Sequence, residues 1–234
     1  MKAVHYQIQV ASENSLIVYF GDEPGLKADQ HIAQQVQYAK QSIEQHLGGM
    51  LVELIPSYAS LLITFDPFKT DQYLIRHLLR KEMAKISEQV AKGGETVEIP
   101  VYYSEETGPD LNRIAIKSGL SIEQVIEQHQ VDSYRVYAIG FAPGFGYLGE
   151  VNERIAMPRL ATPRDKVPKG AVGIADKQTA IYPAESPGGW NIIGRCPLNM
   201  FDPNQQPHMP FDVGDRVKFR AISKKEYFDM GGKL

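Results

Sequence analysis

The chain has 234 residues, a length that allows one large domain or two ordinary ones. Hydrophobic residues make up 43% of it and charged residues 23%, which is the composition of a folded globular protein. The formal net charge of -3 argues against a general binder of nucleic acid or of anionic membranes. The single cysteine, Cys196, excludes an intramolecular disulfide and a multi-cysteine metal site. Its thiol could be nucleophilic, but the role of a small buried apolar residue is favoured.

The N-terminal segment, MKAVHYQIQVASENSLIVYF, contains no basic region followed by an uninterrupted apolar one. It therefore does not resemble a signal peptide. No apolar run approaches the roughly 18 residues that a membrane-spanning helix requires. We expect a soluble, cytoplasmic protein with no membrane partner.

Short β-rich runs in the first part of the chain predict strands at 5–10, 16–20, 50–55 and 60–65. A helix with apolar residues at helical spacing should follow Asp29, its expected N-cap, and a second should begin at about Thr70 and end at Gly93-Gly94. Three histidines in these helical segments have no partner at metal-ligand spacing, so we expect them to be solvated: His31, His46 and His77.

After the first strand, this order is β-α-β-β-α, and residues 96–103 can supply a final strand. The pattern is that of the split βαβ, ferredoxin-like fold, an α+β arrangement of an antiparallel sheet covered by two helices. We place a domain boundary at Gly93-Gly94, which gives a ferredoxin-like domain of residues 1–94 and a second domain of residues 95–234. The boundary would follow the 96–103 strand if that strand joined the first sheet.

Residues 110–130 predict two short helices, the second of which starts with a capping box formed by Ser121 and Gln124. The phrase IAIKSGLSIEQVIEQH resembles a bacterial helix-turn-helix. Its charge argues against DNA binding, because a recognition helix needs cations for phosphate contacts and the second helix carries only acidic residues. We expect a structural helix pair and no nucleic-acid partner.

The stretch from Gly140 to Pro210 contains ten of the 15 prolines and nine of the 20 glycines. This density favours tight turns between short strands, and the runs 171–174 and 178–182 suit strands of a closed or sandwiched β structure. Residues 213–222 predict a turn and an alternating strand that fits the closure of a β-barrel. We therefore expect functional residues on turns of a β structure.

Three aromatic residues, Phe141, Phe145 and Tyr147, follow the strand expected at 133–139. They line a pocket or partner surface, or they plug one end of a barrel, and the pattern leaves both interpretations open. The glycines among them are not a phosphate-binding P-loop, because no GxxxxGK[ST] occurs in the chain.

Seven cations and three acids lie between Arg154 and Arg195, a local charge of +4 in a chain whose total is -3. A positive region on an acidic protein suggests a small anionic ligand or an acidic partner surface. The guanidinium forks of Arg154, Arg159, Arg164 and Arg195 suit a carboxylate or phosphate if at least two converge. The alternative is that these arginines lie on separate turns and are merely solvated.

Four further residues complete the expected substrate-binding set. Gln178 and Tyr182 have the same parity along a strand and should point to one face. Ser186 begins the tight turn SPGGW, which ends in the only tryptophan, Trp190. Ser186 lacks a GxSxG elbow and a nearby histidine, so it is not a nucleophile, and we assign no catalytic residue.

These residues resemble the KipI family, which comprises the B-type subunits of 5-oxoprolinase. This family is related to allophanate hydrolase subunit 1. The motifs that carry the resemblance in the second domain are GFAPGF at 140–145, TPR at 162–164, VP at 167–168, GI at 173–174, QT at 178–179, IYP at 181–183, SPGGW at 186–190, IGR at 193–195, FD at 201–202 and GDRV at 214–217. FGD at 20–22 and ELIPSY at 53–58 extend the resemblance into the first domain. The chain is most similar to Bacillus-type members.

The resemblance implies an α+β first domain and a cyclophilin-like β-barrel second domain. It also implies one subunit of an enzyme that opens 5-oxoproline to glutamate, with ATP as co-substrate of the complex. The sequence of this chain contains no metal-binding motif. A-type and C-type partner subunits, the latter KipA-like, complete that enzyme, so the chain should be inactive alone. Bacillus-type members also inhibit autophosphorylation of a sporulation histidine kinase, and a dedicated role as such a protein-binding inhibitor is the alternative function.

Two positions depart from the family pattern. Ala180 stands where QTGIYP usually has a glycine, and its methyl group would narrow a backbone-lined ligand groove. Asn152 replaces a usual aspartate before Glu153, which weakens any acid role there. Prolyl isomerisation would rest on analogy with the barrel type alone.

Overall fold

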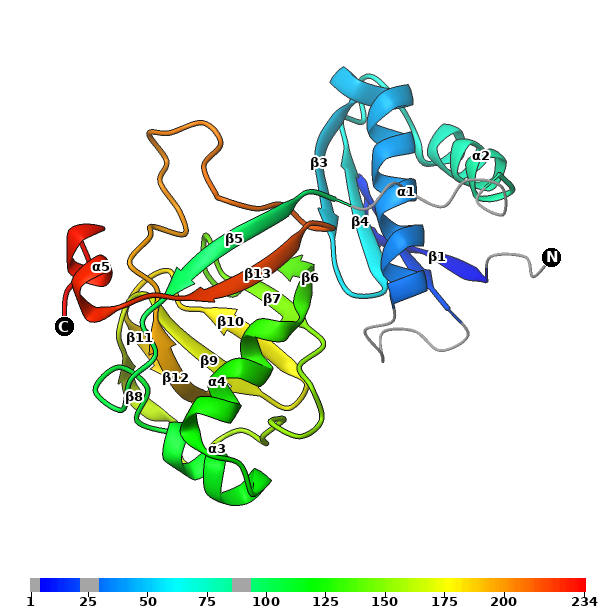
Figure 1. Ribbon diagram of the computed structural model, residues 1–234. Coiled ribbons are helices and arrows are strands. Elements are labelled where there is room, and N and C mark those ends of the chain that lie inside the picture. Colours follow the sequence, from blue (N-terminus) through cyan, green and yellow to red (C-terminus); the bar gives the residue numbers. More distant parts are fainter. Residues whose placement is uncertain (1–4, 22–29, 86–93) are drawn as a thin grey trace. The chain divides into compact units, whose positions relative to one another are not determined.

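The computed structural model describes residues 5–21, 30–85 and 94–234, and the chain divides into two compact units, Met1–Gly93 and Gly94–Leu234 (Figure 1). The N-cap expected at Asp29 lies outside the described residues, as do residues 86–93 at the end of the second expected helix. Each unit has its own cluster of buried hydrophobic residues.

The first unit holds a four-stranded sheet in the order β1-β2-β4-β3, in which each neighbouring pair is antiparallel. Its elements are β1 (Tyr6–Ser12), β2 (Ser15–Phe20), α1 (Gln30–Leu47), a 3-10 turn (Gly48–Met50), β3 (Leu51–Pro56), β4 (Ser60–Phe65) and α2 (Gln72–Met83). The four strands expected here are confirmed, and both helices are present.

One face of this sheet and both helices share a core, because alternate strand residues point to the same side. Val18 of β2 and Ile63 of β4 are fully buried with Ile43 of α1 and Leu79 of α2. The second helix begins one residue beyond its cap, Asp71, whose carboxylate accepts the backbone N–H groups of the following turn at 2.9 Å.

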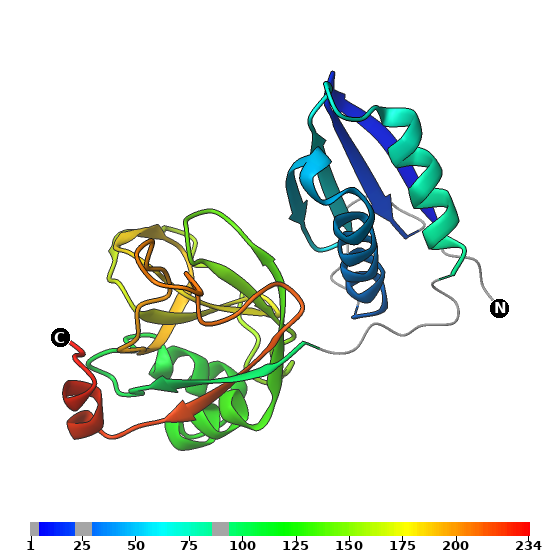
Figure 2. The same ribbon diagram turned by 90° about the horizontal axis from the view of Figure 1, so that it is seen from above.

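Residues 96–103 contribute to the second unit. The strand β5 (Thr96–Val101) pairs in parallel with β13 (Arg216–Ala221), and Figures 1 and 2 show the two running side by side. The possibility that this strand joins the first sheet is therefore wrong. The edge next to β2 is already taken by β1, which forms a hairpin with it through a short turn.

The second unit is built on a seven-stranded sheet in the order β12-β9-β10-β7-β6-β13-β5. The remaining strands are β6 (Ser133–Ile139), β7 (Gly146–Gly149), β9 (Ala171–Ala175), β10 (Gln178–Ile181) and β12 (Asn191–Arg195), while β8 (Arg164–Val167) and β11 (Ser186–Gly188) form a separate pair. The edge strands meet where Tyr102 and Arg195 exchange N–H···O bonds of 2.9 and 3.0 Å. The sheet is therefore curled until its two edges touch.

Three helices accompany this sheet: α3 (Leu111–Ser118), α4 (Ile122–Val131) and α5 (Lys224–Asp229). The capping box at Ser121 and Gln124 is confirmed, with reciprocal bonds of 2.9 and 3.2 Å. Ile114 of α3 and Val125 of α4 are fully buried in the same core as the strands. The helix-turn-helix-like phrase thus packs against the curled sheet.

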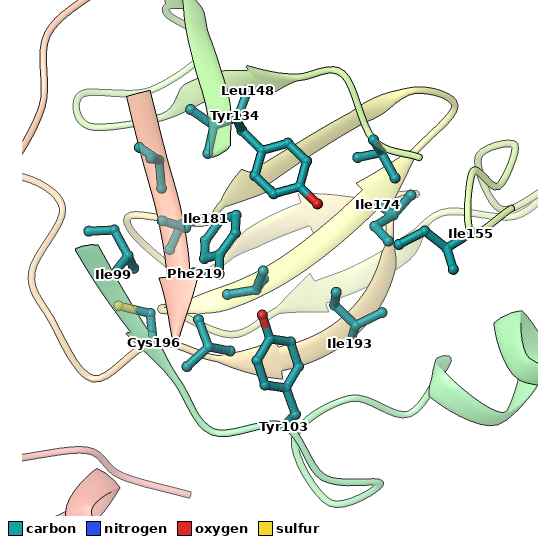
Figure 3. Packing of buried hydrophobic residues seen from close by; sticks show 14 of the residues in the cluster. Ile99, Tyr103, Tyr134, Leu148, Ile155, Ile174, Ile181, Ile193, Cys196 and Phe219 are labelled. Carbon is teal, nitrogen blue, oxygen red and sulfur yellow. The ribbon is translucent and has the colours of Figure 1, made fainter. Parts of the chain in front are cut away.

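The part of the curled sheet formed by β9, β10 and β12 is buried on both faces, while alternate residues of β13 are exposed. Its inner face holds the larger core, into which Ile174, Ile181 and Ile193 point (Figure 3). Cys196 belongs to this core, where it is 3% exposed and burial raises the pKa of its thiol to about 12, as expected of a structural cysteine. The chain is thus a mixed α+β protein whose larger sheet is curled around an apolar interior.

Candidate functional site

The outer face of the curled sheet carries a second cluster, made of aromatic residues and one arginine. Phe145 lies at its centre, with ring centroids 4.9 Å from Tyr147, 5.4 Å from Tyr182 and 5.8 Å from Trp190. The guanidinium carbon of Arg159 lies 5.9 Å from the centroid of the Trp190 ring, within cation–π distance. We call these five residues the aromatic–arginine cluster.

Strand alternation explains how this cluster forms. On β10, Thr179 and Ile181 point to the inner face, while Ala180 and the following Tyr182 point outward and pack with Phe145 and Trp190. The turn after β6 brings Phe145 and Tyr147 over the same face, with Phe141 at its exposed end, where its ring lies 5.3 Å from Phe145. The three aromatics therefore cover the sheet's outer face and do not plug its interior.

Exposure divides the cluster into a floor and a rim. Phe145, Tyr182 and Trp190 are at most 5% exposed, while Tyr147 is half-buried and Arg159 is exposed. Burial raises the pKa of Tyr182 to about 12, and the nearby positive charge of Arg159 opposes that rise. Tyr182 is thus a neutral hydroxyl, and Gly188 is required beside it because a Cβ there would collide with that hydroxyl.

Arg164 supports the cluster from behind. Its Nη2 donates to Asp110 Oδ1 at 2.9 Å, and its Nη1 donates to the backbone carbonyl of Trp190 at 3.3 Å. The other oxygen of the buried Asp110 accepts the backbone N–H of Ile192 at 2.7 Å. Arg164 therefore ties the start of α3 to the segment that carries Trp190.

A second polar contact holds the same segment. Asn191 is fully buried, and its Nδ2 donates to the carbonyls of Pro158 and Ile174, each at 3.0 Å. Arg113 of α3 donates to Asn191 Oδ1 at 3.0 Å. Because Pro158 directly precedes Arg159, Asn191 fixes the backbone that presents that arginine.

The other predicted site residues are not members of the cluster. Arg154 is exposed on the turn after Asn152, and Arg195 ends β12, where its backbone pairs with Tyr102. Gln178 precedes Tyr182 by four residues, about 13 Å along a strand at roughly 3.3 Å per residue. Ser186 pairs with Val167 in the two-stranded sheet.

Several cations of the positive region are neutralised locally. Lys177 contacts Glu153 at 2.6 Å and Lys166 contacts Glu185 at 3.2 Å, in addition to the pairing of Arg164 with Asp110. Among the described residues, no acidic side chain forms such an ion pair with Arg154, Arg159 or Arg195. Of these three arginines, Arg159 is the one that belongs to the aromatic–arginine cluster.

The two departures from the family pattern have structural counterparts. Ala180 is fully buried against the aromatic floor, so its methyl group fills the outer-face core. Asn152 Oδ1 accepts the backbone N–H of Arg154 at 3.0 Å, a turn contact that an aspartate would also make.

A buried polar network lies on the inner face and was not indicated by any sequence motif. His129 of α4 is fully buried, with Nδ1 2.7 Å from Tyr103 Oη and Nε2 2.9 Å from Thr179 Oγ1. Thr179 Oγ1 donates to the carbonyl of Gly173 at 3.0 Å, so Nε2 donates to Thr179 and Nδ1 accepts from Tyr103. Burial lowers the pKa of His129 to about 3, which keeps the ring neutral.

Within the described ranges, no three side chains of His, Cys, Asp and Glu gather as a metal site would require. Over the same residues, no helix combines the length and apolarity needed to cross a membrane.

Comparison with known proteins gives consistent matches. A family model described as carboxyltransferase domain, subdomain C and D, matches residues 6–211. The B-type subunit of 5-oxoprolinase from Bacillus subtilis (strain 168) is 37% identical over 234 residues, which cover 96% of each chain. The crystal structure of TTHA0988 matches with a TM-score of 0.77 and 32% identity over 89% of this chain, which spans 40% of that longer protein.

The Kluyveromyces lactis urea carboxylase has a similar structure, with a TM-score of 0.71. The match covers 96% of this chain and 22% of that enzyme. At 19% identity, this likeness concerns the fold alone.

Proposed function

Because the chain belongs to the carboxyltransferase subdomain C and D family that includes the B-type subunit of 5-oxoprolinase, we propose that it is that subunit of an ATP-dependent 5-oxoprolinase. In this proposal it acts in the cytoplasm and opens 5-oxoproline to glutamate together with A-type and C-type subunits, the latter KipA-like. The relatives' names support the reaction, and the aromatic–arginine cluster supports the part that this chain plays in it.

One observation carries the assignment of the site: an exposed arginine stands over a buried aromatic floor. 5-Oxoproline combines a carboxylate with a small, largely apolar lactam ring. A guanidinium fork matches the carboxylate with two parallel hydrogen bonds, and the half-buried Tyr147 offers an apolar surface to the ring. The face of Trp190 holds the guanidinium in place, so little rotamer freedom is lost when the substrate binds.

The cluster forms one wall of a site. Phe141 at its rim is 68% exposed and has a backbone φ of 72°, a left-handed conformation that costs a non-glycine residue about 1–2 kcal/mol. Such a residue is suited to contact with a partner subunit. The chain contains no P-loop sequence, and we assign the binding of ATP, the co-substrate that activates the lactam, to the partner subunits.

The function is tested by reconstitution. The three subunits are co-expressed and purified together, and ATP-dependent glutamate formation from 5-oxoproline is measured with and without this chain. The proposal expects turnover only when all three are present, and none from this chain alone. Equal turnover by the A-type and C-type subunits without it would contradict the proposal.

The finer fold assignment is part of this proposal. In the first unit, β2, α1, β3, β4 and α2 follow the ferredoxin-like order, with β1 in the edge position that a final strand would take. In the second unit, the curled sheet with its touching edges supports a cyclophilin-like barrel. Prolyl isomerisation has no support beyond this analogy of fold.

The second candidate function is inhibition of a sporulation histidine kinase by a protein-binding surface. The exposed Phe141, which contacts Phe145, and the exposed Arg159 over Trp190 favour it, because aromatic and arginine side chains are enriched at interfaces. Adding the purified chain to a sensor kinase should then reduce autophosphorylation, and the variant Phe141→Ser should relieve that reduction. Autophosphorylation that is unchanged by excess protein would exclude this role.

A further inference from the structure

A cavity of about 450 Å³ lies at the far end of β12 from the aromatic–arginine cluster. Its walls include three cationic residues, Lys169, Arg195 and Lys233, and the apolar surfaces of Pro168, Leu198 and Tyr227. None of the described side chains that line it is acidic. A cavity of this size, with apolar walls and a few charged groups, has the composition of a small-molecule site.

Arg195 is firmly held at the edge of this cavity. Its backbone N–H and C=O both pair with Tyr102, at the point where the edges of the curled sheet meet. Its Nε is buried and has no hydrogen-bond partner. A buried donor without an acceptor is costly, and because Nε has almost no accessible surface, a ligand oxygen can pair with it only when the atoms that cover it move aside.

The guanidinium of Arg195 already donates a hydrogen bond to the segment Gly231–Lys233. The carbonyl oxygen of Lys233 accepts from Arg195 Nη1 at 3.0 Å and from Tyr227 Oη at 2.8 Å. This oxygen occupies one corner of the fork and leaves the Nε edge without an acceptor. The carbonyl therefore competes with any external oxygen ligand for the guanidinium.

We propose that this cavity binds a small organic carboxylate, with one oxygen on Arg195, charge support from Lys169, and the apolar body of the ligand between Leu198 and Tyr227. The segment 231–233 acts as a strap whose carbonyl competes for the arginine. An organic carboxylate fits better than inorganic phosphate, because it has an apolar body that the apolar walls can bury, and a phosphate ion has none.

This site is separate from the one proposed for 5-oxoproline. Trp190 directly precedes β12 and Arg195 ends it, so their Cα atoms lie about 16 Å apart at about 3.3 Å per residue. No member of the aromatic–arginine cluster lines the cavity. The inference therefore stands or falls independently of the reaction proposed above.

The test uses the full chain alone and follows the NMR resonance of the Arg195 Nε–H group, identified by its loss in Arg195→Lys. Benzoate, its neutral isostere benzamide and inorganic phosphate are titrated separately. We expect benzoate to shift the resonance saturably and to bind at least tenfold more tightly than either of the others. Absence of a shift with benzoate, or equal binding of benzamide or phosphate, would overturn the proposal.

Variants examine each part of the site. Arg195→Lys keeps the positive charge but loses the guanidinium fork, and Lys169→Ala removes another cation of the cavity. Each variant should weaken benzoate binding at least fivefold, as measured by calorimetry. Tyr227→Phe removes one of the two donors that hold the strap and should strengthen binding at least twofold. Arg154→Ala is the control and should change nothing. Unchanged affinity in the first three variants would show that this cavity is not where benzoate binds.

Discussion

The two faces of the curled sheet use polar side chains in opposite ways. On the inner face, His129 is enclosed and each ring nitrogen has a protein partner, so its polar atoms serve to fix the packing. On the outer face, Arg159 stands exposed over buried aromatic rings, with no acid paired to it among the described residues. A polar group whose hydrogen bonds are all made within the protein stabilises the fold. An accessible polar group with no such partner, held on a rigid support, can recognise a ligand.

The largest loss of stability should come from removing the His129 side chain from the inner face. His129→Ala removes a ring that stacks on Phe219 at 4.6 Å and leaves Tyr103 Oη without its acceptor. We expect a loss of about 3 kcal/mol in the free energy of unfolding, from the cavity and the unsatisfied hydroxyl together. Urea unfolding measures it, and a loss below about 1 kcal/mol would show that the network contributes little.

The same histidine gives the inner face a dependence on pH. Its pKa is about 3 in the folded chain against an ordinary value of 6.5, so the unfolded state binds the extra proton between these values. Above about pH 6.5 the ring is neutral in both states and does not change the free energy of unfolding with pH. Below that pH, the free energy of unfolding falls by up to about 1.4 kcal/mol per pH unit as the pH drops toward 3.

In His129→Gln this contribution disappears, so the stability of the variant should fall less steeply between pH 6.5 and about 4.5 than that of the natural chain. Unfolding curves of both proteins across this range provide the comparison. Parallel pH profiles would contradict burial of a neutral histidine.

The sequence could predict features that depend on neighbouring residues, but not contacts between segments far apart in the chain. The period-two alternation of strands and the capping box of α4 depend on neighbouring residues, and these predictions are confirmed. The pairing of β5 with β13 joins segments about 120 residues apart, and no local pattern distinguishes it from pairing with the first sheet. The family resemblance is confirmed by the comparisons.

The site shows the same limit. Glycine and proline density located the turns that carry Arg159 and Trp190, but four arginines on those turns look alike in sequence. Their roles diverge through distant partners: Asp110 engages Arg164, while Arg195 meets a segment near residue 233. Asp110 and Asn191 were not anticipated, because their partners are backbone groups and side chains far along the chain.

A smaller effect is expected at the support behind the outer face. Asp110→Asn keeps an acceptor for the Ile192 N–H but loses the charge that pairs with Arg164. We expect a loss of about 1–2 kcal/mol in unfolding free energy, since Arg164 is partly solvated and retains some hydration. Asp110→Ala should cost more, and equal stability of the two variants would show that the N–H contact is unimportant.

The smallest effect on stability should come from Arg159 itself. Arg159→Ala removes an exposed side chain that lies over the face of Trp190. We expect the unfolding free energy to change by no more than about 0.5 kcal/mol, as for other surface substitutions. A larger loss would mean that Arg159 is a structural residue like Arg164.

The most direct measurement is the rate of the reconstituted three-subunit complex with Arg159→Ala in this chain. Loss of a charged hydrogen bond to the substrate carboxylate is worth about 1.5–3 kcal/mol, so kcat/KM for 5-oxoproline should fall about 10- to 150-fold. Arg154→Ala, an exposed arginine of the same positive region, should leave it unchanged. Equal activity of both variants and the natural complex would contradict the assignment of the outer face as the substrate site.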